Sequence, residues 1–401
     1  MKRALRQRVV RGNVAVHYST SPKFEVLMTS KLFTPIKLAN VELPNRVIVA
    51  PMCTYSADDG SATDWHLMHL GQFAVSGMGL VFVEATGVEP AGRISPGCLG
   101  LWSDANEAAL KKVVDFCKDF GNAKMGMQLA HAGRKGSTDF PWVGGKQLPA
   151  DDARGWQTVG PSDEPFAGGW QTPTELDAAG LERVKKAFVE ATERCIRIGF
   201  DVLELHMAHG YLFHQFLSPI SNKRTDQYGG NLENRMRYPL EVFDAVRAVW
   251  PKGMPLGVRI SATDWVEGSS WDVREAAEFA KVLKTHNCDF IDVSSGGSSP
   301  AQEIDAGPGY QTGFAADIRR ASGIPTMAVG QITSPQQAEA IIRSEQADMV
   351  ALARGMLYNP RWAWHAAEAL DAEAAYAPQY MRTHKSLRGL PIPGNPPTAK
   401  S

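Results

Sequence analysis

The chain has 401 residues, 44% of them apolar and 21% charged, a composition that excludes a disordered or fibrous protein. The 42 Lys and Arg residues balance 43 Asp and Glu residues, so there is no overall basic field that would attract nucleic acid. The five cysteines form no CxxC pair, which argues against a disulfide framework or a zinc site and fits a reducing, cytoplasmic compartment. The longest uncharged stretch, residues 65–83, holds two His, a Gln, a Ser and three Gly, so no membrane span is expected.

Residues 1–28 differ in composition from the rest of the chain. Six basic residues stand there against one acidic residue, Glu25. Such a segment is similar to an organellar transit peptide. The other interpretation is an upstream start codon, with the folded protein beginning near Met28. In both cases we expect residues 1–28 to be a basic extension outside the fold.

From Lys31 onward a short apolar run, a loop and a helix-patterned stretch follow one another eight times. Continuous apolar runs are typical of parallel strands that helices cover on both sides. The pattern predicts a single (β/α)8 TIM barrel over residues 29–375 and a tail over residues 376–401. A doubly wound sheet is the alternative, but it would need a GxGxxG turn, and the sequence has none. The predicted strands are Val47–Met52, Leu80–Ala85, Met125–Ala130, Val202–His206, Leu256–Ile260, Phe290–Ser294, Thr326–Val329 and Met349–Ala353.

Helix signals stand between these runs. Ser334 with Pro335 is typical of a helix start, and Asp272 is a plausible cap for a helix that ends near His286. The segment 131–176 is too long for a plain connector, and we expect it to form a capping subdomain over the catalytic face. One apolar stripe with helical spacing consists of Leu181, Val184, Phe188, Ala191, Cys195 and Ile198.

Polar side chains stand at the carboxyl ends of the predicted strands, where the chemistry of a TIM barrel lies. Buried polar groups need partners, and a bound ligand is the expected one. The loops after strands seven and eight form the common phosphate site of such barrels. Here they carry Gly330, whose backbone can approach a phosphate, and Arg354, whose guanidinium can hold it. The alternative is that Arg354 pairs with a carboxylate such as Asp348.

Several long motifs follow one another in order. The most specific is His206-Met207-Ala208-His209-Gly210-Tyr211-Leu212, and two others are Ala50-Pro51-Met52-Cys53-Thr54-Tyr55 and Gln128-Leu129-Ala130-His131-Ala132-Gly133-Arg134-Lys135. Over about residues 31–365 the sequence resembles the Old Yellow Enzyme family of flavin-dependent ene-reductases. It is most similar to the cysteine-containing branch that includes bacterial xenobiotic reductases.

The resemblance implies a non-covalent FMN on the catalytic face. Gln128 and Arg259 would hold the pyrimidine edge of the ring, and Arg259 would place a positive charge where a reduced flavin becomes anionic. The alternative for Gln128 is a buried amide tied to the backbone. Many relatives carry a glycine before the phosphate-binding arginine, where this chain has Ala353, but the backbone N–H is kept. The residues implied to line the ring are Ala50, Pro51, Met52, Cys53 and Ala85, and those implied at the phosphate are Gly330, Ala353 and Arg354.

The resemblance also implies that His206 and His209 bind the substrate oxygen, that Tyr211 donates a proton and that Tyr55 closes the substrate pocket. The i,i+3 spacing puts the histidines on one face if the turn is helical, and two N–H donors can form an oxyanion hole. A phenol is protonated at neutral pH and can act as a general acid. A structural histidine pair is one alternative. We expect no metal site, since that would need a third ligand and Glu204 would point away from His209.

Cys53 follows directly on the first strand. It either tunes the potential of the flavin or is an inert buried thiol, and we favour tuning without a nucleophilic role. In some relatives a C-terminal Arg or aromatic residue reaches into the neighbouring subunit. Arg382 is the candidate for that role here, and a homo-oligomer is therefore expected.

Together these features predict an FMN-dependent NAD(P)H oxidoreductase, an ene-reductase that reduces the C=C bond of α,β-unsaturated carbonyl or nitro compounds. The β-carbon would receive a hydride from the flavin, and the α-carbon a proton from Tyr211. The lack of GxGxxG agrees, because the nicotinamide need only stack on the flavin. The alternatives are a flavin barrel of other chemistry such as N-demethylation, a non-redox barrel enzyme with phosphate-bearing substrates, and a non-catalytic flavin binder.

Overall fold

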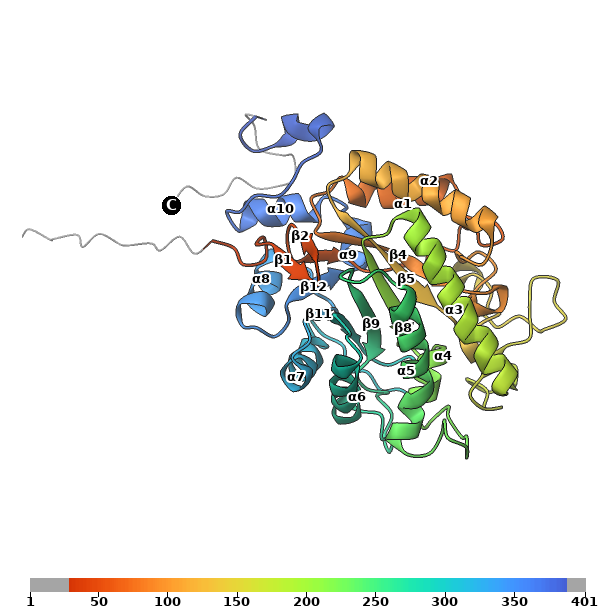
Figure 1. The fold of residues 1–401 in the computed structure, drawn as a ribbon. Coiled ribbons are helices and arrows are strands. Elements are labelled where there is room, and N and C mark those ends of the chain that lie inside the picture. Colours follow the sequence, from red (N-terminus) through yellow and green to blue (C-terminus); the bar gives the residue numbers. More distant parts are fainter. Residues whose placement is uncertain (1–28, 388–401) are drawn as a thin grey trace, which may run out of the picture.

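A closed barrel of eight parallel strands forms the centre of the computed structural model, which describes residues 29–387. Each barrel strand pairs with the next one along the chain, and β12 pairs with β3 to close the ring. Helices surround the strands (Figure 1), and the predicted (β/α)8 barrel is confirmed. The strands are β3 (Val47–Val49), β4 (Leu80–Gly87), β5 (Lys124–Ala130), β8 (Val202–Met207), β9 (Leu256–Ser261), β10 (Phe290–Ser294), β11 (Thr326–Ala328) and β12 (Met349–Leu352).

The strand ends differ from the predicted ones by a few residues. β10 has the predicted bounds, whereas β3 ends at Val49 rather than at Met52. Pro51 explains this difference, because it has no N–H with which to continue the ladder. β12 ends at Leu352, so that Ala353 lies just outside the strand as the cap of the next helix.

Apolar side chains fill the barrel toward the amino ends of its strands. The rings of Phe82 and Phe290 lie 6.3 Å apart there. Glycines opposite make room for them, since a Cβ at Gly126 would lie 2.6 Å from the Phe82 ring and one at Gly257 2.5 Å from the Phe290 ring. This end of the barrel is therefore packed with apolar side chains.

An antiparallel hairpin precedes the barrel. It consists of β1 (Ile36–Leu38) and β2 (Val41–Leu43). Leu38 and Leu43 belong to the same apolar cluster as the inner side chains of the barrel, so the hairpin closes its amino end. The sequence analysis did not predict this hairpin, which is only three residues long on each side.

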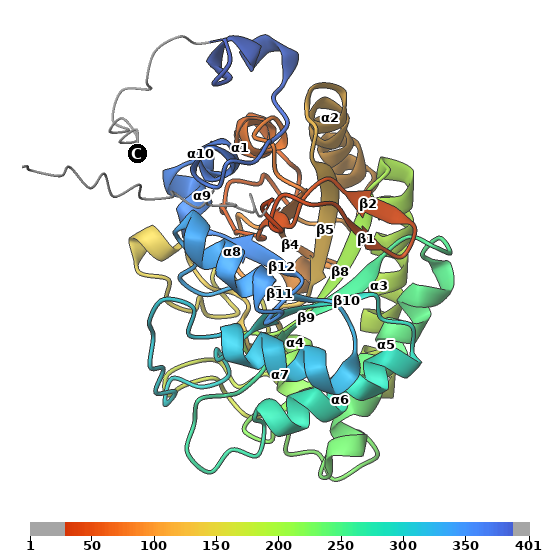
Figure 2. The ribbon, with the colours of Figure 1, turned by 90° about the vertical axis from the view of Figure 1, so that its left-hand side faces the viewer.

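The helices lie outside the strands, as Figure 2 shows from a second side. The helix start at Ser334 is confirmed, because its hydroxyl accepts the N–H of Gln337 at 3.1 Å. Asp272 caps its helix as expected, and the predicted stripe on α3 is buried. The helices are α1 (Asp64–Ala74), α2 (Asp104–Phe120), α3 (Ala178–Ile198), α4 (Leu212–Leu217), α5 (Leu232–Val249), α6 (Val273–Thr285), α7 (Thr312–Ser322), α8 (Pro335–Arg343), α9 (Arg354–Tyr358) and α10 (Trp362–Ala369).

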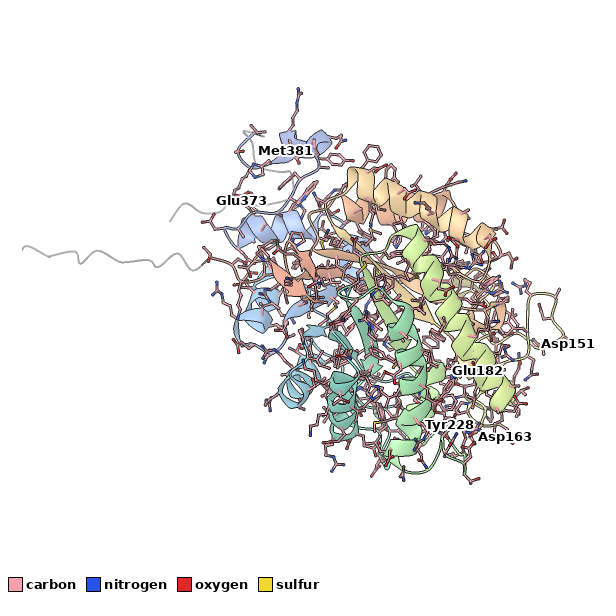
Figure 3. The ribbon with its side chains drawn as sticks, in the orientation of Figure 1. Asp151, Asp163, Glu182, Tyr228, Glu373 and Met381 are labelled. Carbon is pink, nitrogen blue, oxygen red and sulfur yellow. The ribbon has the colours of Figure 1, made fainter. Side chains whose placement is uncertain are left out.

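The segment 131–176 contains only short elements and is held together by its own side chains. The Gln171 amide, for example, donates to the backbone oxygen of Leu148 at 2.6 Å. In Figure 3 the labelled Asp151 and Asp163 of this segment lie at the right of the molecule, and the labelled Glu373 and Met381 lie at the upper left. The elements are η1 (Pro90–Gly92), which precedes the segment, η2 (Gly133–Lys135), η3 (Pro141–Val143), β6 (Val159–Gly160), β7 (Thr174–Glu175) and, near the C-terminus, η4 (Pro378–Thr383).

The predictions made for residues 1–28, and for the part of the tail beyond residue 387, lie outside the described residues. Within residues 29–387 no helix is long and apolar enough to cross a membrane.

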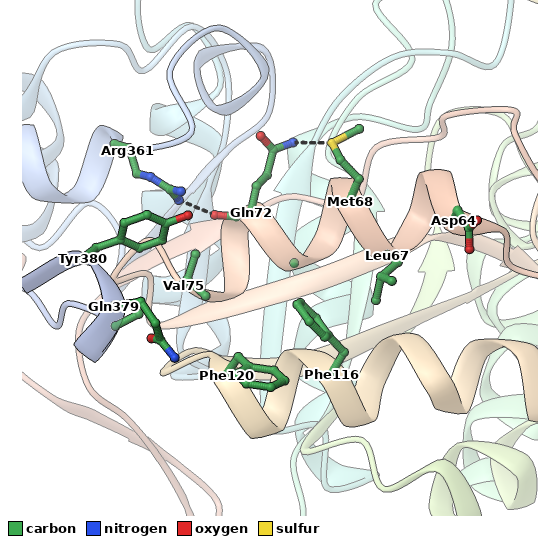
Figure 4. Close-up of a pocket in the computed structure, with 12 residues that line it drawn as sticks. Asp64, Leu67, Met68, Gln72, Val75, Phe116, Phe120, Arg361, Gln379 and Tyr380 are labelled. Atoms are coloured by element: carbon green, nitrogen blue, oxygen red, sulfur yellow. Dashed lines mark hydrogen bonds between the residues drawn. The ribbon is translucent and has the colours of Figure 1, made fainter.

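A groove of about 630 Å³ lies on the outer surface between α1, α2 and the C-terminal segment (Figure 4). Phe116, Phe120 and Tyr380 line it, and none of the site residues predicted from the sequence does.

Candidate active site

The turn after β8 brings the two predicted histidines together. His209 has a left-handed backbone with φ of 59°, and Gly210 follows with φ of 72°. A Cβ on Gly210 would lie 2.1 Å from the backbone oxygen of Gly297, so the turn requires glycine there. The turn is therefore not helical, so the condition under which the i,i+3 spacing puts both histidines on one face is not met. The rings nevertheless converge, with His206 Nε2 and His209 Nδ1 only 3.2 Å apart.

Tyr211 completes this cluster at the start of α4. Its ring stands edge-on to the ring of His206, with the centroids 5.0 Å apart. Burial raises the pKa of the Tyr211 phenol well above its usual value, which keeps the proton on its oxygen. Burial and the charge of Arg259 lower the pKa of both histidines, so their rings are neutral at pH 7. Three neutral groups that can donate hydrogen bonds thus meet at the carboxyl end of β8.

Lys135 is a member of this site that sequence reasoning missed. Its ammonium donates to the backbone oxygens of His209 and Gly297, both at 2.8 Å, and lies 5.2 Å from the centroid of the Tyr211 ring. Burial and Arg134 lower the pKa of Lys135 to about 7. It stands in one of the motifs quoted above, but the sequence contains no signal that a lysine after strand three is buried against the turn after strand four.

The buried side chains of His214 and Asp264 support the turn after β8. His214 Nδ1 accepts the N–H of Gly210 at 2.9 Å, and His214 Nε2 lies 3.0 Å from Asp264 Oδ1. The hydroxyls of Ser218 and Ser269 donate to the other oxygen of Asp264, at 2.6 and 2.7 Å. The side chains of His214 and Asp264 are both completely buried. This arrangement holds the backbone between His209 and Tyr211 in place.

Below the histidines, toward the middle of the barrel, four polar side chains face inward. The Gln128 amide donates to Glu204 Oε1 at 2.7 Å, and Arg259 Nε lies 3.1 Å from Asp292 Oδ2. Gln128 is therefore tied to a side chain and not, as the alternative had it, to the backbone. The sequence analysis assigned no role to Glu204 or Asp292 here, although a carboxylate inside an otherwise apolar strand was a visible signal.

The loop after β3 is fastened to β4. The N–H and the hydroxyl of Thr54 donate to the carboxylate of Glu84, at 3.0 and 2.8 Å. Next to it, a hydrogen bond with Cys98 and burial raise the pKa of the Cys53 thiol, which is therefore protonated. A protonated thiol agrees with the expectation that Cys53 is no nucleophile. The predicted residues on this loop are Pro51, Met52, Cys53 and Tyr55, all half-buried.

Two small residues lie at the neighbouring strand ends. A register shift between Val83 and Ala85 in β4 pairs Ala85 with Gln128 across the β4–β5 ladder. Ala50 follows β3, and its N–H donates to the backbone oxygen of Leu352 at 2.9 Å. The structure thus places both alanines at the carboxyl edge of the barrel, Ala85 directly beside Gln128.

The predicted phosphate residues lie at the ends of β11 and β12. Gly330 has φ of 122°, and a Cβ there would lie 2.9 Å from Gln311 Nε2. Ala353 caps α9, and Arg354 is the first residue of that helix and exposed. Asp348 is bound by Arg319 at 2.9 Å, so the alternative pairing of Arg354 with Asp348 is not formed. Within residues 29–387 the Arg354 side chain has no ion-pair partner. Its guanidinium is therefore not occupied by a carboxylate and can bind an anion.

Arg382 is not part of this cluster. It lies exposed in η4, next to Tyr380, which lines the outer groove. The prediction that it reaches a neighbouring subunit stays a prediction.

Residues 31–373 match the protein family described as the NADH:flavin oxidoreductase / NADH oxidase family. The chain belongs to this family. An NADH:flavin oxidoreductase of Gibberella zeae is 43% identical to it, with 88% of each chain covered. An NADPH dehydrogenase of Geobacillus sp. is 44% identical, over 88% of this chain and 99% of the relative. Among solved structures, morphinone reductase matches with a TM-score of 0.72 and 28% identity, over 87% of this chain and 92% of that one.

These relatives identify the chain as an Old Yellow Enzyme-type oxidoreductase that uses a flavin and a nicotinamide reductant. Membership excludes the non-redox alternative considered from the sequence. The residues present fit a flavin nucleotide, since Arg259 and Arg354 offer positive charge at two separate points of one barrel edge. The polar rim of the barrel is thus suited to an anionic ring with a phosphate tail.

Proposed function

We propose that the protein is an FMN-dependent ene-reductase that reduces activated C=C bonds in α,β-unsaturated carbonyl or nitro compounds, with NADH or NADPH as reductant. The convergence of His206 Nε2 and His209 Nδ1, 3.2 Å apart beside the Tyr211 phenol, carries the proposal. Two neutral imidazoles aimed at one point suit a carbonyl or nitro oxygen that gains negative charge during the reaction. When bound, the FMN supplies the hydride that it has taken from the nicotinamide.

The residues proposed to hold the FMN form three groups. Gln128 and Arg259 hold the pyrimidine edge, which carries both donors and acceptors. Gly330, Ala353 and Arg354 hold the phosphate without a covalent bond. The guanidinium of Arg354 supports this role, because it is exposed and has no ion-pair partner within residues 29–387. The ring rests on Ala50, Pro51, Met52, Cys53 and Ala85.

The proposed catalytic step uses groups that burial keeps neutral. His206 and His209 donate to the substrate oxygen and draw electrons away from the β-carbon. Tyr211 delivers its proton to the α-carbon, a role that its raised pKa permits because the phenol stays protonated. Lys135 keeps the turn in place through the backbone oxygens that it binds.

We also propose that Tyr55 and the segment 131–176 close the substrate side of the site. The ring of Trp142 stands 5.9 Å from the ring of Tyr55, edge to face. The ring of Phe166 lies 4.7 Å from Lys135 Nζ, on the same lysine that borders Tyr211. Aromatic side chains of the insertion therefore flank two site residues, which supports its role as a cap.

The cofactor is tested by heating the purified protein and determining the mass of the released chromophore. We expect FMN and a typical flavin absorption spectrum before heating. FAD in the supernatant, or a protein that takes up no flavin on reconstitution, would contradict the proposal.

The catalytic assignment is tested with Tyr211→Phe, which keeps the ring and removes the proton. Stopped-flow kinetics should show the reaction with an enone slowed by about 10²–10⁴. Flavin reduction by NADPH should stay nearly unchanged, since that step needs no proton from Tyr211. Tyr228→Phe is the matched control, because Tyr228 lies by Glu241 and outside the site. Equal slowing of both half-reactions would make Tyr211 structural.

His206→Ala or His209→Ala should weaken the binding of phenols and slow alkene reduction by about 10²–10³.

The homo-oligomer and the cytoplasmic location expected from the sequence stay predictions. Sedimentation velocity of the flavin-loaded protein tests the first, and fractionation of the source cells tests the second.

A further inference from the structure

The hydrogen bonds of His206 define where its ring proton lies. His206 Nδ1 accepts the N–H of Ala208 at 3.2 Å, so the neutral ring carries its proton on Nε2. That N–H points at His209 Nδ1, 3.2 Å away. His206 can therefore donate from Nε2 either to His209 or to a substrate oxygen placed between the two rings.

His209 has two possible arrangements, and its second nitrogen decides between them. His209 Nε2 lies 2.7 Å from the hydroxyl oxygen of Ser294, a buried residue at the end of β10. If the hydroxyl accepts, the proton of His209 is on Nε2, and Nδ1 can only receive the N–H of His206. If the hydroxyl donates, the proton is on Nδ1 and faces the point toward which His206 also donates.

Substrate binding needs the second arrangement. Two N–H groups can meet one oxygen only if His206 carries its proton on Nε2 and His209 carries its proton on Nδ1. Each ring has one proton in both arrangements, so that only the position of a single proton differs. The hydroxyl of Ser294 must then donate to His209 Nε2.

The surroundings leave Ser294 free to do so. Its other hydrogen-bond partner, Gln311 Oε1, is 3.5 Å away, and the hydroxyl of Ser295 already donates to that oxygen at 2.5 Å. Gln311 is also fixed by its amide, which donates to the backbone oxygen of Val329 at 3.0 Å. Turning the Ser294 hydroxyl from Gln311 to His209 gives up only the long hydrogen bond to Gln311, because the short one to His209 is kept with its direction reversed.

We propose that Ser294 is a positioning residue whose hydroxyl donates to His209 Nε2 and so holds the ring proton on Nδ1, where it binds the substrate oxygen together with His206. The inference rests on the proposed function, in which both histidines bind that oxygen. Within residues 29–387 no other side chain forms a hydrogen bond with His209 Nε2. Lys135 and Ser261 contact only the backbone of His209.

The test compares flavin-loaded wild-type protein with three variants, using 4-chlorophenol as the probe for the substrate oxygen. Ser294→Ala removes the hydroxyl and should weaken phenol binding about tenfold. Ser294→Thr keeps the hydroxyl and should restore the affinity to within about twofold of wild type. Ser295→Ala is the matched control, since this serine is as buried and binds the same Gln311 but does not touch His209. It should bind the phenol as the wild type does.

Nitrogen-15 NMR of histidine-labelled protein reads the proton position directly. In the wild-type phenol complex His209 should carry its proton on Nδ1 and have a bare Nε2, and Ser294→Ala should show a mixture. A proton on His209 Nε2 in the wild-type complex would overturn the proposal. This measurement uses the wild-type protein alone, so it does not depend on whether a variant folds. Wild-type affinity in Ser294→Ala would also overturn it.

The two levels of proposal can be told apart. If the wild type binds phenol and reduces enones but Ser294→Ala behaves like Ser295→Ala, only the role of Ser294 is wrong. If the wild type itself neither binds phenol nor reduces an activated alkene, the proposed function fails and the role of Ser294 fails with it.

Discussion

Glu204 and Asp292 are carboxylic acids on the inner wall of the barrel, each on a strand that is otherwise apolar. Burial and the nearby Asp292 raise the pKa of Glu204 to about 8, and burial raises that of Asp292. Arg259 opposes both shifts through its positive charge. One positive charge is thus shared between two acids, and Glu204 holds its proton at neutral pH while it accepts from Gln128.

This charge balance predicts a pH-dependent stability. A carboxyl whose pKa is raised by folding binds more protons folded than unfolded, so the free energy of unfolding falls as the pH rises toward 8. Glu204→Gln keeps an acceptor for Gln128 but cannot ionise. We expect urea titrations at pH 5, 6.5 and 8 to show that the free energy of unfolding of the variant increases relative to that of the wild type as the pH rises. The increase should be at most about 1.4 kcal/mol per pH unit.

Glu193→Gln, on the exposed face of α3, is the control for this experiment and should follow the wild type at each pH. A stability difference between Glu204→Gln and wild type that is the same at pH 5 and pH 8 would show that Glu204 does not titrate in this range.

At the scale of elements, the turn from β8 to α4 depends on a partner from the loop after β9. His214 holds the N–H of Gly210, and Asp264 accepts from two serine hydroxyls and lies 3.0 Å from His214. Hydrogen bonds lower the pKa of Asp264 even though burial alone raises it. A left-handed turn that no helix or strand ladder supports is thus fixed by buried side chains.

Asp264→Ala should therefore cost more stability than the loss of an ordinary helix cap. It leaves the buried donors of His214 and Ser218 and the half-buried hydroxyl of Ser269 without an acceptor, and we expect the free energy of unfolding to drop by about 3 kcal/mol or more. Asp272→Ala removes the cap of α6 and should cost about 1 kcal/mol. Urea unfolding of both variants measures the difference, and equal losses would mean that Asp264 does not support the turn.

At the scale of the whole molecule, the start of the described chain is fastened to α8. The carboxylate of Glu339 accepts from the hydroxyl of Ser30 at 2.7 Å and from the N–H groups of Lys31 and Leu32 at 2.8 and 2.9 Å. Burial raises the pKa of Glu339, but these hydrogen bonds outweigh burial and lower it overall. The contact joins residues more than 300 positions apart, beside the hairpin that closes the barrel.

Glu339→Ala should lower the free energy of unfolding at pH 7 by about 3 kcal/mol, because it removes the charged acceptor of three hydrogen bonds. Since folding lowers the pKa of Glu339, its contribution is present at neutral pH and is lost as the pH falls through that pKa. The difference from wild type in urea unfolding should therefore shrink toward pH 3.

Glu345→Ala is the control, since Glu345 pairs with the same Lys31 at 3.6 Å but is largely exposed. An exposed ion pair contributes little, and the change should stay within about 0.5 kcal/mol. Equal effects of the two variants would contradict the role given to Glu339.

The barrel and its rim of polar residues follow from local patterns in the amino-acid sequence. Eight apolar runs of strand length are a local signal, because strands covered on both sides must be apolar along their whole length. Helix starts such as Ser334 are local too, since the cap binds an N–H only three residues away. The order of the strand ends then placed His206, Gln128, Arg259 and Arg354 on one edge, because parallel strands in a barrel end on the same side.

The way in which these side chains meet depends on the tertiary fold. The left-handed backbone at His209 lies against Gly297, from the loop after β10 about 90 residues further on, and the i,i+3 spacing alone does not reveal this conformation. Lys135, Ser294 and Asp264 reach the same turn from three other loops or strands, and nothing local marks them. Their roles follow from contacts between distant segments, which burial and hydrogen bonding select only once the barrel has closed.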